Sequence, residues 1–149
     1  MTYAGPSTDA VSMLLSVFAL AALTALMMLW MYATRLPAMQ RAGLEPQAAA
    51  HTASLTGKLP ASAERVADNY NHLTEAPTVF YAVALAIVAL GAADQLHAVC
   101  AWAYVGLRFA HSLVQATVNR VAVRFVLFTL SWAALTVIIL RGSAKALSL

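Results

Sequence analysis

The chain has 149 residues, of which 62% are hydrophobic and 10% are charged, whereas a soluble domain has about 45–50% apolar residues. This composition, with a mean hydropathy of +0.75, excludes an ordinary soluble domain and indicates an integral membrane protein. The formal net charge of +3 comes from scattered Lys and Arg residues without interleaved aromatic residues, so a nucleic-acid partner is not expected.

The first predicted element is the apolar run at residues 11–33, which holds 23 residues without a charge. A membrane-spanning helix needs about 20 apolar residues, and Ser7, Thr8 and Asp9 can cap such a helix at its start. Arg35 and Pro37 are expected to end the helix. The polar, alanine-rich stretch at residues 41–60 is then expected to be a loop.

The remaining chain predicts three more helices. The second runs from about residue 62 to residue 93, with a kink at Pro77, because proline removes one backbone hydrogen bond and crowds the preceding turn. The third, residues 96–118, is apolar at first and is expected to be capped by Asp94, and the fourth is expected at residues 121–141. With a first span at residues 10–35, the sequence predicts one domain over residues 1–149, an all-α membrane bundle of four helices.

The distribution of Lys and Arg predicts how the bundle is oriented. Most of them lie in the first and third connections, whereas Arg141 and Lys145 lie on the opposite side. Because loops rich in Lys and Arg stay in the cytoplasm, both termini are expected to face away from it. No positive residue precedes the first apolar run, so a cleaved secretory signal is not expected.

Two predicted helices carry polar residues at positions where a membrane helix is normally apolar. At about 100° per residue, one stripe of the second helix holds Arg65, Asp68, Asn69, His72 and Glu75. In the third helix, Arg108, His111 and Gln115 are spaced i, i+3 and i+7 and share a face. A charge at mid-bilayer costs at least about 2.5–3.5 kcal/mol, so these faces are expected to meet each other, a neighbouring subunit or a wet cavity.

Three interpretations of these stripes follow. Glu75 could pair with Arg108 or another arginine as a purely structural ion pair. The excess of cations, with Arg120 and Arg124 nearby, favours instead a polar pocket for an anionic guest. His72, Glu75 and His111 could also ligate a metal, but lone His and Glu residues at helical spacing are more often hydrogen-bonding partners, so no metal site is expected.

Two segments resemble the MAPEG family, the membrane-associated proteins in eicosanoid and glutathione metabolism, and in particular its bacterial branch. In ADNYNHLTEAPTVFYAVAL an amide-rich stretch leads to Leu-x-Glu-x-Pro-x-x-Phe-Tyr, and in AWAYVGLRFAHSLVQATVNRVAVRF an Arg-x-x-His-Ser stretch leads to Asn-Arg and a further arginine. The resemblance covers most of the chain. It implies a homotrimer in a bacterial inner membrane, with sites between protomers near the cytoplasmic face.

The resemblance also implies roles for individual residues. Arg124 matches an arginine that helps to activate glutathione and is the candidate catalytic residue. The candidate glutathione-binding residues are Arg65, Asn71, His72, Glu75, Arg108, His111, Gln115 and Arg120. His72 stands where the family has an asparagine, Gln115 where it has a tyrosine, and Asp68 where an arginine is common.

Two functions follow from the resemblance. The first is a glutathione-dependent transferase or peroxidase that acts on lipophilic electrophiles, with glutathione as cosubstrate. The departures at Asp68, His72 and Gln115 favour the alternative, a non-catalytic trimeric protein that binds lipids or a membrane-protein partner, like the family's lipoxygenase-activating member. The sequence leaves open whether the protein is an enzyme.

Overall fold

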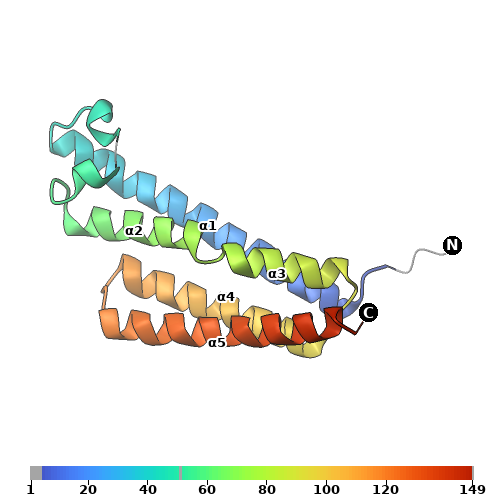
Figure 1. Ribbon diagram of the computed structural model, residues 1–149. Helices are drawn as coiled ribbons and strands as arrows, with labels where there is room; N and C mark the ends of the chain where they lie inside the picture. The colour runs from blue at the N-terminus through green and yellow to red at the C-terminus, as the bar shows by residue number, and fades with distance from the viewer. Residues whose placement is uncertain (1–4, 51, 149) are drawn as a thin grey trace.

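The computed structural model describes residues 5–50 and 52–148, and α-helices make up most of it (Figure 1). The first helix, α1 (Thr8–Arg41), is 34 residues long. Of the three predicted capping residues, Ser7 caps this helix, because its hydroxyl oxygen accepts a hydrogen bond from the backbone N–H of Ala10 at 3.2 Å.

The expectation that Arg35 and Pro37 end the first helix is wrong, because α1 continues through both residues. Its last turns pack into a small hydrophobic cluster made of Ala38, Met39, Leu55, Leu59 and Ala63. Ala38 and Met39 are only 6% and 7% exposed. Burial of their apolar surface offsets the single backbone hydrogen bond that Pro37 removes.

The connection after α1 contains two short 3₁₀ helices, η1 (Pro46–Ala49) and η2 (Thr52–Leu55). Figure 1 places both at the end of the bundle opposite to the N- and C-termini. The segment that the sequence predicted as a loop is therefore folded back on α1, and Leu55 and Leu59 anchor it there.

The second predicted helix is divided into α2 (Ala61–Glu75) and α3 (Thr78–Ala89). The break falls at Pro77, as predicted from the loss of its N–H. Ala76 and Pro77 keep right-handed backbone angles, with φ of −64° and −76°, so α3 follows the general course of α2 (Figure 1). The break separates a polar helix from an apolar one.

The last two helices, α4 (Gln95–Ala116) and α5 (Val121–Ala146), form an antiparallel hairpin and lie side by side (Figure 1). Asn119 makes the turn between them with φ of 51°, a left-handed conformation that asparagine tolerates better than most residues. The turn lies at the same end of the bundle as η1 and η2 (Figure 1).

At the end of the bundle opposite to this turn, Asp94 joins the start of α4 to the end of α5. Its carboxylate caps α4 by accepting the N–H of His97 at 3.0 Å, as the sequence predicted, and it also contacts Arg141 Nη2 and Lys145 Nζ, both at 2.7 Å. Lys145 donates a second hydrogen bond to the carbonyl of Ala92 at 2.9 Å. The Arg141 guanidinium, with further support from Lys145, holds the pKa of the Asp94 carboxyl well below its usual range.

Three helical stretches are long and apolar enough to cross a membrane: α1, the continuous path of α2 and α3, and α5. Large apolar side chains cover their outer surfaces, among them Phe18 and Phe125, each 68% exposed. Such a surface suits acyl chains and not water. The predicted all-α membrane bundle of four helices is therefore confirmed.

Candidate functional site

Arg108 of α4 is completely buried, with 0% of its surface exposed, and it reaches across to α2. Its Nη2 donates to the backbone carbonyl of His72 at 3.3 Å and lies 2.8 Å from the Nδ1 of the same residue. A guanidinium has only donors, so Nδ1 of His72 is the acceptor. The neutral ring therefore carries its proton on Nε2.

Aromatic contacts extend this pair into a cluster of side chains from three helices. The His72 ring stacks on the His111 ring, with centroids 5.0 Å apart and planes inclined by 19°. Phe128 of α5 meets His72 edge-on at 5.4 Å, and Arg108 Cζ lies 5.8 Å from the centre of the Phe128 ring. We refer to His72, Arg108, His111 and Phe128 as the Arg108 cluster.

The charge of Arg108 has no acidic partner among the described residues. The salt bridges found there all involve Asp94, at the other end of the bundle. Glu75 is exposed and makes no ion pair in the described part of the chain, so the predicted structural pair with Arg108 or another arginine does not form within one copy. Because a buried unpaired charge is costly, the free Nε and Nη1 of Arg108 are strong sites for an anionic acceptor.

The start of α5 positions the candidate catalytic residue. Arg124 is half-buried, and its Nη1 donates to the side-chain oxygen of Asn119 at 2.7 Å. Its buried Nε has no hydrogen-bond partner among the described residues. Arg120 is the residue before α5 and is exposed. The turn at Asn119 thus fixes one edge of the Arg124 guanidinium and leaves Nε available.

The other predicted residues are distributed around the Arg108 cluster. Gln115 is 4% exposed, and its carbonyl oxygen has no partner among the described residues. Arg108, His111 and Gln115 are therefore all buried on one face of α4, as their spacing predicted. Arg65 is half-buried, whereas Asn71 and Glu75 are exposed, and no side-chain hydrogen bond or ion pair joins them to the cluster in the described part of the chain. The structure thus brings together only part of the predicted set.

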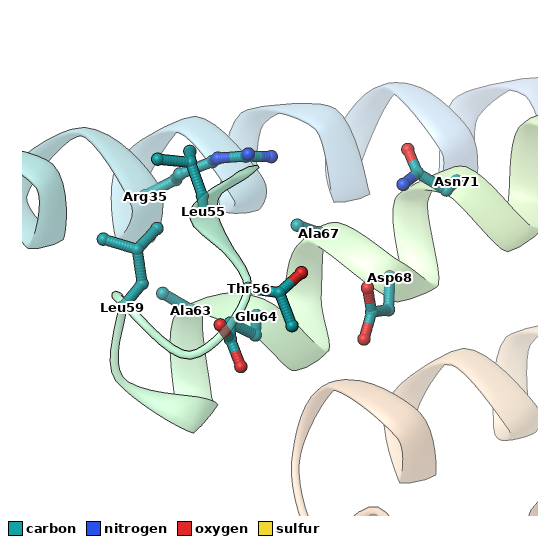
Figure 2. Close-up of a pocket in the computed structure, with 9 residues that line it drawn as sticks. All are labelled: Arg35, Leu55, Thr56, Leu59, Ala63, Glu64, Ala67, Asp68 and Asn71. Carbon is teal, nitrogen blue, oxygen red and sulfur yellow. The ribbon is translucent and has the colours of Figure 1, made fainter. Parts of the chain in front are cut away.

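Asn71 instead lines a separate pocket of about 210 Å³ between α1, the segment after η2, and α2 (Figure 2). The other residues around this pocket are Arg35, Leu55, Thr56, Leu59, Ala63, Glu64, Ala67 and Asp68. The residues of the single polar stripe predicted on α2 therefore contribute to two different sites. His72 faces α4 and α5, whereas Asp68 and Asn71 belong to the pocket beside α1.

Sequence reasoning missed Phe128, which contacts both histidines and Arg108. It lies in an apolar run where no signal marks it. Asn69 belonged to the predicted stripe without a role of its own, yet it is 0% exposed, and both polar atoms of its amide lack partners within residues 5–50 and 52–148. The signal available in the sequence was an amide side chain within a helix expected to cross the membrane, where an amide needs a hydrogen-bonding partner.

His72, Glu75 and His111 do not form a metal centre of three ligands. Only the two imidazoles come together, and one of them already uses Nδ1 to accept from Arg108. Across the described residues, no group of three or more His, Cys, Asp or Glu side chains is arranged to hold a metal ion.

The described residues thus form a bundle of apolar helices that encloses a cationic cluster of side chains from α2, α4 and α5, which is typical of a helical membrane protein with a polar interior. The model of the MAPEG family matches residues 13–144 of the chain. The protein therefore belongs to the MAPEG family of helical membrane proteins, which is associated with eicosanoid and glutathione metabolism. Comparison with curated proteins and with solved structures gave no match.

Proposed function

We propose that the protein is a homotrimeric membrane enzyme that uses glutathione to conjugate lipophilic electrophiles or to reduce lipophilic peroxides. The observation that carries this proposal is Arg108, a fully buried cation with two free donor atoms and no acidic partner among the described residues. Membership of the MAPEG family supports glutathione as the anionic ligand. The hydrophobic cosubstrate would arrive through the bilayer.

Arg124 is the proposed activator of the glutathione thiol. A free Nε beside the sulfur would favour the thiolate over the thiol, since a nearby cation stabilises the anion. Lowering a thiol pKa from about 8.5 to about 6.5 takes about 2.7 kcal/mol. One close guanidinium can supply an interaction energy of this size. The thiolate then attacks the electrophilic carbon and displaces the leaving group.

Binding of the rest of glutathione involves several charged side chains. Arg65 and Arg108 would hold carboxylates, and His111 would donate a hydrogen bond. Glu75 would accept the amino group, because it is an exposed carboxylate without an ion-pair partner in the described chain.

The trimer is supported by charges that a single copy leaves unpaired. Glu75 is exposed on a helical path that crosses the membrane, where lipid is a poor environment for a carboxylate. Arg120 is exposed at the start of α5. Contact between copies would cover both charges and would place Glu75 of one copy near the arginines of another. In this arrangement the site lies near the cytoplasmic face, and both termini face away from it.

Calorimetry of glutathione binding in detergent micelles tests the proposal. The native protein should bind glutathione, and Arg124→Ala should weaken binding and remove conjugation to a chromogenic aryl halide. Arg41→Ala is the control, since Arg41 is an exposed arginine in the last turn of α1, outside the Arg108 cluster. Absence of binding to the native protein at millimolar glutathione would overturn the proposal.

A specific observation favours the alternative, a non-catalytic trimer that binds lipids or a membrane-protein partner. His72 already occupies Nη2 of Arg108, and the buried side chain at position 115 is an amide without a hydroxyl group. A stoichiometric lipid or protein that copurifies with the chain, together with no thiol conjugation, would support this alternative over the enzyme.

A further inference from the structure

The pocket beside α1 has rigid walls. Gly57 adopts φ of 75° and donates its N–H to Glu64 Oε1 at 2.6 Å, which fastens the segment after η2 to the first turn of α2. Leu55 and Leu59, 2% and 8% exposed, anchor the same segment in the hydrophobic cluster. These contacts hold in place the segment after η2 that lines one side of the pocket of about 210 Å³.

Opposite charges line this pocket without neutralising each other. Figure 2 shows the guanidinium of Arg35 on the side of α1, with the carboxylates of Glu64 and Asp68 on the other side. Glu64 uses one oxygen for Gly57. Within the described chain, Arg35 and Asp68 make no ion pair with each other or with another residue.

This arrangement of charges differs from that around Asp94. At the other end of the bundle, the exposed Arg141 and the partly buried Lys145 both contact the single carboxylate of Asp94. At the pocket, a guanidinium and a carboxylate that could pair instead stand apart across a hollow. A guest with both signs of charge would satisfy both groups at once.

We propose that this pocket binds a small zwitterion that carries a primary ammonium group next to an anionic group. The anion would lie on the Arg35 guanidinium, whose planar fork matches phosphate or carboxylate. The ammonium would donate to Asp68, with the side-chain oxygens of Thr56 and Asn71 as further acceptors. A trimethylated ammonium cannot donate these hydrogen bonds and is excluded.

This chemistry has two kinds of source at a membrane surface. One is the headgroup of phosphatidylethanolamine, which would enter the pocket from the bilayer. The other is the amino-acid end of a free peptide such as glutathione. The headgroup source does not rest on the proposed enzymatic function, because the pocket shares no residue with the Arg108 cluster, although it includes Asn71, a candidate glutathione-binding residue.

The test uses the full-length protein in non-ionic detergent and isothermal calorimetry with four soluble probes: O-phosphoethanolamine, phosphocholine, inorganic phosphate and glutathione. The variants are Asp68→Asn, which keeps the size of the side chain, and Arg35→Gln, which replaces the guanidinium with a shorter neutral amide. Glu45→Gln and Arg41→Gln are the controls, since both residues are exposed near the same connection but outside the pocket. Size-exclusion chromatography and the helical circular dichroism signal confirm folding of every variant.

We expect O-phosphoethanolamine to bind the native protein at least tenfold more tightly than phosphocholine. Both pocket variants should weaken it at least tenfold, and neither control should. Binding of phosphate alone should depend on Arg35 and not on Asp68. Pocket variants that also weaken glutathione binding would support a free amino acid or peptide as the ligand, whereas variants that weaken O-phosphoethanolamine alone would support a lipid headgroup.

Three results would overturn the inference. The first is no binding of O-phosphoethanolamine to the native protein at millimolar concentration. The second is equal affinity for phosphocholine, which would mean that no ammonium N–H is recognised. The third is binding that Asp68→Asn and Arg35→Gln leave unchanged, which would place the ligand elsewhere on the protein.

Discussion

Arg108 and His72 are 36 positions apart in the chain, and one guanidinium nitrogen of Arg108 lies within hydrogen-bonding distance of both a ring nitrogen and the backbone carbonyl of His72. This double contact joins α4 to α2 inside the bundle. It also fixes which ring nitrogen of His72 carries the proton. The pair thus holds α4 against α2 and also sets the protonation of the His72 ring next to the candidate site.

Replacing His72 should show how far Arg108 depends on it. His72→Ala removes the Nδ1 acceptor and the stacking partner of His111, and we expect the free energy of unfolding to fall by about 1–3 kcal/mol. His72→Asn keeps an acceptor oxygen and should cost less. Denaturant titration in mixed micelles measures both changes. Equal stability of His72→Ala and the native protein would mean that the contact contributes nothing.

Arg108→Met should separate stability from binding. Methionine fills much of the same volume without a charge, so removing an unpaired buried cation should leave the free energy of unfolding unchanged or raise it. Glutathione binding should weaken at least tenfold, which corresponds to about 1.4 kcal/mol. Unfolding titration and calorimetry on the same sample measure the two effects. A strongly destabilised Arg108→Met would show that protein groups already compensate the charge.

Asp94 should make the stability of the bundle depend on acidity. The pKa of its carboxyl is depressed in the folded state, mainly by the hydrogen bond from Arg141. Its stabilising contribution is therefore complete above the unfolded-state pKa of about 3.9 and disappears as the pH falls below it. Asp94→Asn keeps a capping side chain, so it isolates the lost charge.

At pH 7 we expect the apparent melting temperature of Asp94→Asn to be about 2–4 °C lower than that of the native protein. The difference should shrink as the pH is lowered from about 4. Thermal scans in detergent across this range measure it. A difference that stays constant with pH would assign the effect to something other than the carboxylate charge.

Gly142 marks a close approach between α5 and α3. A Cβ atom at this position would lie 2.7 Å from Ile87 Cδ1 and 2.9 Å from Ile87 Cγ1, so Gly142→Ala should destabilise the protein by about 1–3 kcal/mol. Adding Ile87→Val removes the nearest atom and should restore part of the loss. Gly106→Ala is the control, because no atom lies within 4 Å of its added Cβ.

Unfolding of the two single variants and the double variant measures the coupling. If Gly142→Ala matches Gly106→Ala in stability, the close approach is loose enough to absorb a methyl group. If Ile87→Val fails to improve Gly142→Ala, the clash involves the backbone and not the isoleucine side chain.

Features that depend on neighbouring residues in the sequence could be predicted. Ser7 and Asp94 cap helices because a short polar side chain reaches N–H groups in the following turn. Pro77 interrupts a helix because it has no N–H. The common face of Arg108, His111 and Gln115 follows from their spacing alone.

Features that depend on how two helices are placed against each other could not be predicted. Helical spacing put His72 and Glu75 on one stripe, but it does not show where a neighbouring helix covers that stripe. The position of α4 along α2 brings Arg108 to His72 and not to Glu75. The extension of α1 beyond Pro37 was missed for the same reason, since its cause is packing against Leu55 and Leu59.

The break at Pro77 sets how deep the polar residues of α2 lie in the bilayer. Helix α3 has 12 residues and rises about 18 Å, whereas the hydrocarbon layer is about 30 Å thick. If α3 begins its crossing at the headgroups beyond Ala89, the final turns of α2, with His72 and Glu75, lie within the hydrocarbon layer. A bare carboxylate is costly at that depth, which supports the proposed contact of Glu75 with a second copy of the chain.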